Sequence, residues 1–217
     1  MVPLSKKIFW FVGIVAVCII GIIVLTGKEK ESASIDYEGQ PFLGDASAPV
    51  DIVEFGDYQC PHCKDFNDSL LPVIEKELVE TGKAKFYFMN YAFMGPDSTA
   101  SAQFAETVYK ELGNEVFWKF HHLLFANQTD ESGKAMQFTD DVMETLLAEV
   151  AGTEDVQQVL DAYQEGKGNE ALKKDMSIAN HLGISSTPSI FINGKLFEGS
   201  SMKDFFDQVD EATESGK

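Results

Sequence analysis

The distribution of apolar and polar positions divides the chain into an uncharged run near its start and a long region of mixed periodicity. Ile8 to Leu25 contains no charged residue, and Lys6 and Lys7 precede it. As a helix this run spans about 27 Å at ~1.5 Å per residue, close to the hydrocarbon thickness of a bilayer. We therefore expect a transmembrane helix over 8–26, with residues 1–7 in the cytoplasm because of the two lysines.

A cleaved secretory signal peptide is the alternative interpretation of this run. The apolar core of a signal peptide is usually about 7–15 residues long, and a small-residue cleavage site follows it closely. Here the charged segment from Lys28 to Glu31 intervenes before the first small residues, Ser32 and Ser34. These features favour an anchor, with the remainder of the chain outside the cell; signal cleavage would instead give a secreted protein.

Beyond a Gly-, Ser-, Lys- and Glu-rich tether over 27–40, the pattern indicates alternating strands and helices. Period-two and aromatic-rich runs predict strands within 41–49 and at 50–55, 85–91, 189–192 and 196–197. Apolar residues at three- and four-residue spacing predict helices at 61–82, 98–112, 116–125, 140–151, 156–163, 169–182 and from Ser201 onward. Asn193-Gly194 predicts a tight hairpin turn. Ser201 and Asp204 form a partial capping box.

This order of elements predicts an α/β domain with helices on both faces of a small sheet. A helical block over 96–183 interrupts the domain, whose two parts are 41–95 and 184–217. Pro72 is expected to kink the first helix, because proline lacks the N–H that would bond to the carbonyl of Asp68.

The charge of the chain is strongly one-sided. The net charge is −18, all 35 Asp and Glu lie after residue 27, and the basic residues are all Lys. Such an acidic surface argues against nucleic acid and against an anionic membrane surface as partners. No run has the D-x-D-x-D-G spacing of a calcium loop, so the carboxylates give calcium binding little support. The simplest interpretation is a solvated acidic surface.

Cys60 and Cys63 are the only cysteines outside the predicted span. A disulfide between residues this close encloses a very short loop, so it adds little stability by restricting the unfolded chain. A structural disulfide is therefore a poor explanation for the pair. Redox chemistry, metal binding and an inert buried pair remain.

The motif Cys60-Pro61-His62-Cys63 lies where a predicted strand leads into a helix. The first N–H groups of that helix have no intrahelical partner, point at the Cys60 sulfur and favour the thiolate, which lowers its pKa. Pro61 suits the first turn because its missing N–H needs no partner. His62 would stabilise the anion further if protonated or donating a hydrogen bond. Cys63, one turn on, would face the core and resolve a mixed disulfide at Cys60.

A zinc site is the main alternative for the cysteines. Zinc knuckles usually have Gly after the second Cys and a second ligand pair elsewhere, whereas Lys64 follows Cys63 and no second pair exists. The remaining imidazoles offer little help. The aromatic spacing around His121 and His122 indicates packing inside a helix, and we interpret His181 in the same way.

The segment from Val53 to Cys63, with Thr187-Pro188-Ser189 ahead of the last hairpin, resembles the DsbA/BdbD family of thioredoxin-fold disulfide oxidoreductases. The resemblance covers roughly residues 40–215. It implies a thioredoxin-like fold with an inserted all-helical subdomain. It also implies a cis peptide bond at Thr187-Pro188, beside the two cysteines, that shapes the peptide-binding face.

Glu54 is the second feature that the resemblance explains. It lies in an apolar strand with Val50 and Ile52 on the same face, where a carboxyl group is costly to bury without a role. The resemblance implies that Glu54 lies under the active site and relays a proton to or from Cys63. The predicted site is therefore Cys60, Cys63, His62, Pro61, Glu54, Thr187 and Pro188.

The Pro-His dipeptide between the cysteines resembles that of strong oxidants rather than that of reductive thioredoxins. We expect an extracytoplasmic oxidase that donates its Cys60–Cys63 disulfide to reduced exported proteins and needs no cofactor or metal. By resemblance, a quinone-linked membrane protein of the DsbB type would reoxidise it. A disulfide isomerase or reductase with the same site, a metal-delivery protein using the two cysteines, and a non-catalytic binding module are the alternatives.

Overall fold

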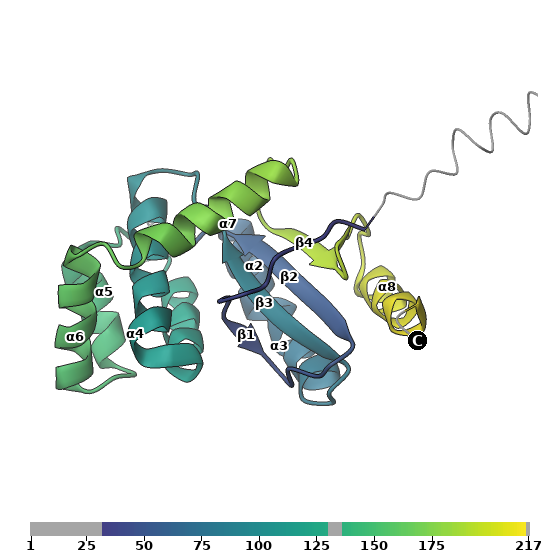
Figure 1. Cartoon of the computed structure of the whole chain (residues 1–217), viewed down its shortest axis with the longest axis horizontal. Helices are drawn as coiled ribbons and strands as arrows, with labels where there is room; N and C mark the ends of the chain where they lie inside the picture. Colours follow the sequence, from purple (N-terminus) through teal and green to yellow (C-terminus); the bar gives the residue numbers. More distant parts are fainter. Residues whose placement is uncertain (1–31, 130–135, 216–217) are drawn as a thin grey trace, which may run out of the picture. The chain divides into compact units, whose positions relative to one another are not determined.

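The computed structural model describes residues 32–129 and 136–215 (Figure 1). The predicted cytoplasmic segment, the predicted span over 8–26 and the start of the tether lie outside these ranges. From Ala33 on, the chain forms one compact unit. None of the helices within the described ranges has the length and apolar character needed to cross a membrane.

Five strands form one mixed sheet in the order β1-β3-β2-β4-β5. The strands are β1 (Phe42–Leu43), β2 (Val50–Gly56), β3 (Ala84–Asn90), β4 (Ser189–Ile192) and β5 (Lys195–Leu196). β2 and β3 run parallel, and the other neighbouring pairs run antiparallel. The sheet confirms the predicted strands and places β2, which leads to the cysteine motif, at its centre.

The last hairpin differs from the prediction by one residue. Asn193 and Gly194 have φ values of 45° and 76°, as the tightest two-residue hairpin turns require. Because the turn uses only these two residues, Ile192 pairs with Lys195 and Phe191 pairs with Leu196. The returning strand therefore begins at Lys195 and not at Leu196.

Helices cover both faces of the sheet, as predicted. On one face, Val50 and Ile52 of β2 share a core with α2 (Pro61–Ser69), α3 (Leu71–Ile74), the π-helical turn η1 (Glu75–Val79) and α8 (Met202–Ser215). On the other face, Val53 and Phe55 pack against α7 (Asn169–His181). Because side chains alternate along β2, Glu54 projects toward the same face as Ile52 and α2.

The helical insertion lies between β3 and β4 and contains four helices of the described chain (Figure 1). These are α4 (Pro96–Ala126), α5 (Asp140–Ala148), α6 (Thr153–Gln164) and α7. α4 packs against the other three and also against α2, so it joins the insertion to the sheet region. Gly113 interrupts α4 with φ 80° and ψ −175°, at the break predicted between 98–112 and 116–125. The predicted mixed α/β fold with a helical insertion is confirmed.

Pro72 divides the first predicted helix and does more than kink it. α2 ends at Ser69, and Pro72 lies in the first turn of α3, where a missing N–H is tolerated. The N–H groups of Val73 and Ile74 bond to the carbonyl of Leu70 and restart the helical ladder. Breaking the helix here leaves α2 as a short element with the cysteine motif at its N-terminus.

Candidate active site

Cys60 is the N-cap residue of α2, directly beyond the loop that follows β2. Its backbone is extended, with φ −82° and ψ 119°, and Pro61 occupies the first helical turn. The backbone N–H groups of Cys63 and Lys64 both donate to the Cys60 carbonyl, each at 3.1 Å. The structure thus confirms that the motif lies between a strand, β2, and the start of a helix, α2.

The two cysteines are free thiols and both are buried. The Cys63 thiol hydrogen-bonds to the Cys60 sulfur, and this contact does most to lower the pKa of Cys60, to about 5. Burial opposes this effect, while Thr187 and the backbone N–H groups of Cys63 and His62 lower the pKa further. The sequence predicted the direction of the shift; its largest source is the neighbouring thiol, ahead of the helix N–H groups.

The pKa of Cys63 is shifted in the opposite direction to that of Cys60. The hydrogen bond to Cys60, burial and the charge of Glu54 together raise the pKa of Cys63 far above its ordinary value. At neutral pH the pair therefore holds one negative charge, on Cys60, and one proton, on Cys63. This division assigns the nucleophile and leaving group to Cys60 and the protonated partner to Cys63.

The loop before β4 brings Thr187 and Pro188 against the motif. The Thr187-Pro188 peptide bond is cis, which confirms the expectation. The Cys60 sulfur lies 3.5 Å from the backbone carbonyl oxygen of Thr187. The Thr187 hydroxyl is buried without a normal hydrogen-bond partner in the described chain, and its proximity to Cys60 lowers the pKa of that thiol.

Glu54 is completely buried beneath the cysteines. Neither carboxylate oxygen has a hydrogen-bond partner of normal geometry among the described residues. Burial raises the pKa of Glu54 well above its ordinary value; the Cys63 thiol lowers it, and the charge on Cys60 raises it again. Burial therefore favours the protonated form of this carboxyl group, which lies where it can exchange a proton with Cys63.

The His62 side chain lies at the surface, and stabilisation of the Cys60 anion by its imidazole stays a prediction. This side chain is 81% exposed, and its Nδ1 lies 3.8 Å from Oδ2 of the equally exposed Asp65. The group of His62 that acts on Cys60 is its backbone N–H, which lowers the pKa of the thiol. The imidazole points to solvent because it occupies the outer side of the first turn of α2.

Asp57 is a buried residue of the site that sequence reasoning missed. Its carboxylate accepts the backbone N–H groups of Gln59, Phe93 and Met94 at 2.8, 3.0 and 3.1 Å. It therefore fixes the turn before Cys60 and joins it to the loop after β3. An Asp two residues before a turn N–H is a typical Asx turn, so this part of its role was open to prediction.

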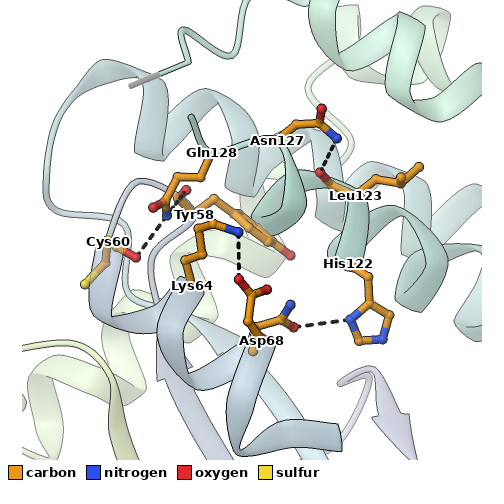
Figure 2. Close-up of polar contacts among 9 residues, drawn as sticks. Tyr58, Cys60, Lys64, Asp68, His122, Leu123, Asn127 and Gln128 are labelled. Atoms are coloured by element: carbon orange, nitrogen blue, oxygen red, sulfur yellow. Dashed lines mark hydrogen bonds and ion pairs between the residues drawn. The ribbon is translucent and has the colours of Figure 1, made fainter. Parts of the chain in front are cut away.

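Gln128 is the second residue that was missed. Its Nε2 donates to the carbonyl oxygens of Tyr58 and Cys60, each at 2.9 Å (Figure 2). It follows α4, far from the motif in sequence, and no local pattern marks it.

His121 is packed in the interior, as predicted, whereas the prediction of packing for His181 is wrong because its side chain is exposed. His121 is buried, its Nδ1 lies 3.1 Å from the Tyr58 hydroxyl, and burial lowers the pKa of its imidazole well below the ordinary value. His122 Nδ1 lies 3.2 Å from Asn67 Oδ1, and His181 is exposed at the end of α7. In the described part of the chain, no group of three or more His, Cys, Asp or Glu could hold a metal ion.

The chain resembles proteins that form disulfide bonds. Residues 36–211 match the family model described as thioredoxin. Disulfide bond formation protein D of Bacillus subtilis is 34% identical over 197 residues, which cover 88% of this chain and 84% of that protein. The Bacillus cereus protein named "Probable disulfide bond formation protein D" is 32% identical over 174 residues, which cover 80% and 79% of the two chains.

Solved structures give the same picture. The crystal structure of oxidised BdbD from Bacillus subtilis aligns with a TM-score of 0.76 and 29% identity, over 84% of this chain and 97% of that one. DsbA of Chlamydia trachomatis aligns with a TM-score of 0.67 and 22% identity, over 87% and 95% of the two chains, which is a likeness of fold.

Proposed function

This chain belongs to the thioredoxin family and is a thiol–disulfide oxidoreductase of the DsbA/BdbD type, and on this premise we propose that it works as an oxidase. It passes the Cys60–Cys63 disulfide to reduced exported proteins during their folding. The observation that carries this direction is the unequal pair of thiols, because the low pKa of Cys60 stabilises the reduced protein. A protein whose reduced form is stable gives its disulfide away readily.

The exchange is a two-electron transfer in two displacements. A substrate thiolate attacks the Cys60 sulfur, the Cys60–Cys63 bond breaks, and the electron pair leaves on Cys63, which takes up a proton. A second substrate thiolate then attacks the substrate sulfur of the mixed disulfide. Cys60 leaves as a thiolate, so the substrate gains a disulfide and the enzyme is left reduced. Attack of Cys63 on the mixed disulfide is the competing return step.

Glu54 supplies the proton for the first displacement in this scheme. The sulfur of Cys63 leaves into a buried position where its pKa is strongly raised, so an unprotonated Cys63 is unfavourable there. Glu54 is buried beside it, and burial raises its pKa, which favours the protonated form. The same carboxylate can accept the proton when Cys63 attacks in the return step or during reoxidation.

The proposed direction predicts that the reduced protein is more stable than the oxidised protein at pH 7, and that this advantage grows with pH. The pKa of Cys60 is lowered from 9.0 to about 5 in the folded protein. The resulting stabilisation is therefore complete above pH 9 and is lost as the pH falls through 5. Between pH 5 and pH 7 it grows by about 2 kcal/mol, because half of Cys60 is already ionised at pH 5 and each further pH unit adds about 1.4 kcal/mol.

Denaturant unfolding of the reduced and the oxidised protein at pH 5, 6 and 7 measures this difference. The same series on Glu54→Gln serves as the control, because it removes the other ionisable group that senses the cysteines. An oxidised form that is the more stable one at pH 7 would identify a reductase. A stability difference that does not change with pH would mean that the Cys60 thiolate is not its cause. Either result would contradict the proposal.

We propose that the domain lies outside the cytoplasm, tethered by a helix over 8–26. The support is the uncharged run from Ile8 to Leu25 after two lysines, together with a disulfide chemistry that requires an oxidising compartment. Alkaline extraction of cell membranes tests the anchor. Retention of the full-length chain in the membrane is expected, and release of a chain that starts near Ser34 would indicate signal cleavage.

We propose that a quinone-linked membrane oxidase of the DsbB type restores the disulfide. The Cys60 thiolate attacks a disulfide of that partner, and Cys63 then attacks Cys60, so two electrons pass to the partner and on to the quinone. Trapping the redox state in cells depleted of quinone should reveal the reduced form of Cys60 and Cys63. A pair that stays oxidised under quinone depletion would exclude this route.

A further inference from the structure

Gln128 buries its side-chain amide against the turn that carries the active cysteine. It lies two residues after the end of α4 and is 3% exposed. One nitrogen, Nε2, donates to both the Tyr58 and the Cys60 carbonyl, at 2.9 Å each (Figure 2). These carbonyls flank Gln59, so a single amide spans the three residues that lead into α2.

The contact between the insertion and this turn is reciprocal. The backbone N–H of Met136 donates to the Gln128 carbonyl at 2.8 Å, and Gln59 Nε2 reaches the Met136 carbonyl at 3.4 Å. The Tyr58 ring packs on Phe125 of α4 with centroids 5.0 Å apart. The turn from Tyr58 to Cys60 is therefore held by Phe125, Gln128 and Met136 of the insertion.

The Cys60 carbonyl is the point at which this contact meets the redox chemistry. It accepts the N–H groups of Cys63 and Lys64 in addition to Gln128. The torsion ψ of Cys60 sets the direction of this carbonyl, and it also sets how the first turn of α2 lies relative to the Cys60 sulfur. Holding the carbonyl therefore holds the N–H groups of His62 and Cys63 in place beneath that sulfur.

We propose that Gln128 is a positioning residue of the redox site, which holds the Tyr58 and Cys60 carbonyls so that the first-turn N–H groups stay directed at the Cys60 sulfur. The helical insertion thereby takes part in setting the redox properties of the thioredoxin-like part. This role rests on the proposed oxidase function. Gln128 touches no reacting atom and acts through the backbone of Cys60.

Gln128→Met tests the role, because methionine has a similar length and no hydrogen-bond donor. We expect the pKa of Cys60 to rise by about one unit. The equilibrium constant for reduction of the Cys60–Cys63 disulfide by glutathione should then fall about tenfold, which corresponds to a potential about 30 mV lower. The groups that face the sulfur, Cys63, Glu54 and Thr187, are unchanged in this variant.

Asn127→Ala is the matched control. Asn127 is the neighbouring amide, and its Nδ2 donates to the Leu123 carbonyl of its own helix at 2.9 Å (Figure 2). It should leave both the Cys60 titration and the glutathione equilibrium unchanged. A Gln128→Met protein that melts at a lower temperature yet keeps both redox readouts would reduce Gln128 to a structural contact and overturn the inference.

An NMR titration of the unsubstituted protein tests the same role without relying on a variant that could fail to fold. The side-chain amide NMR signal of Gln128 should shift with pH at the midpoint of the Cys60 titration, and that of Asn127 should not. A Gln128 amide that ignores this titration would also overturn the inference. If Cys60 itself titrated near 9.0, the proposed function would fail first, so the two failures are distinguishable.

Discussion

Replacing Cys63 by Ala is expected to abolish disulfide donation completely and to trap partner proteins on Cys60. Without Cys63 no disulfide can form within the motif. The Cys60 thiolate can still attack a disulfide of the reoxidising partner, from which one sulfur leaves as a thiolate, and the resulting mixed disulfide has no neighbouring thiol to resolve it. The same change should raise the pKa of Cys60 from about 5 toward its ordinary value, because the Cys63 thiol does most to lower it. Trapped complexes are detected on non-reducing gels, and the pKa from the pH dependence of alkylation.

Cys63→Ser separates the two effects of the substitution. Serine also prevents a disulfide, so donation should be lost equally in both variants. Its hydroxyl can still donate to the Cys60 thiolate, so the pKa of Cys60 should rise less than in Cys63→Ala. Equal and unshifted titrations in the two variants would mean that the helix N–H groups, not the neighbouring thiol, hold the anion.

Glu54→Gln is expected to slow both formation and release of mixed disulfides by about 100-fold, the lower end of the range known for a lost general acid or base. The amide keeps the size of the side chain but cannot exchange a proton with Cys63. Stopped-flow kinetics with a thiol peptide measure the rate. The equilibrium constant with glutathione should change far less than the rate, since Glu54 serves as a proton carrier.

Glu106→Gln provides the comparison for Glu54. Glu106 is likewise a buried carboxyl group whose pKa burial raises, but it bonds to Asn90 and lies on α4. Its substitution tests whether any buried acid in this region affects the rate. Unchanged kinetics in Glu54→Gln, or equal slowing in both variants, would remove Glu54 from the mechanism.

The sequence was sufficient for those parts of the site that depend on local chemistry. A cysteine before a proline at the start of a helix implies a thiolate near free N–H groups, and the structure has Cys60 at the N-cap of α2. Asn193-Gly194 implies a two-residue turn, and the hairpin closes on it. The placement of Glu54 and of the cis bond before Pro188 came from family resemblance, because no local rule brings them to the cysteines.

The parts that could not be predicted depend on contacts between distant segments or on side-chain orientation. Gln128 reaches Cys60 across 68 positions, through the packing of a whole subdomain. Asp175 likewise accepts hydrogen bonds from Gln40, which precedes β1, and from Asn90 at the end of β3. The exposed imidazole of His62 follows from its position on the outer side of a helical turn, which residue type alone does not specify.

The proposed oxidase activity requires Cys60 to be a thiolate at neutral pH, and titration of its thiolate absorbance in the reduced protein tests this directly. Cys60→Ala provides the baseline, because it removes the titrating thiol while burial still raises the pKa of the remaining thiol, Cys63. The expected midpoint is about 5. A midpoint near 9.0, the ordinary value for cysteine, would contradict the oxidase assignment and leave only the fold.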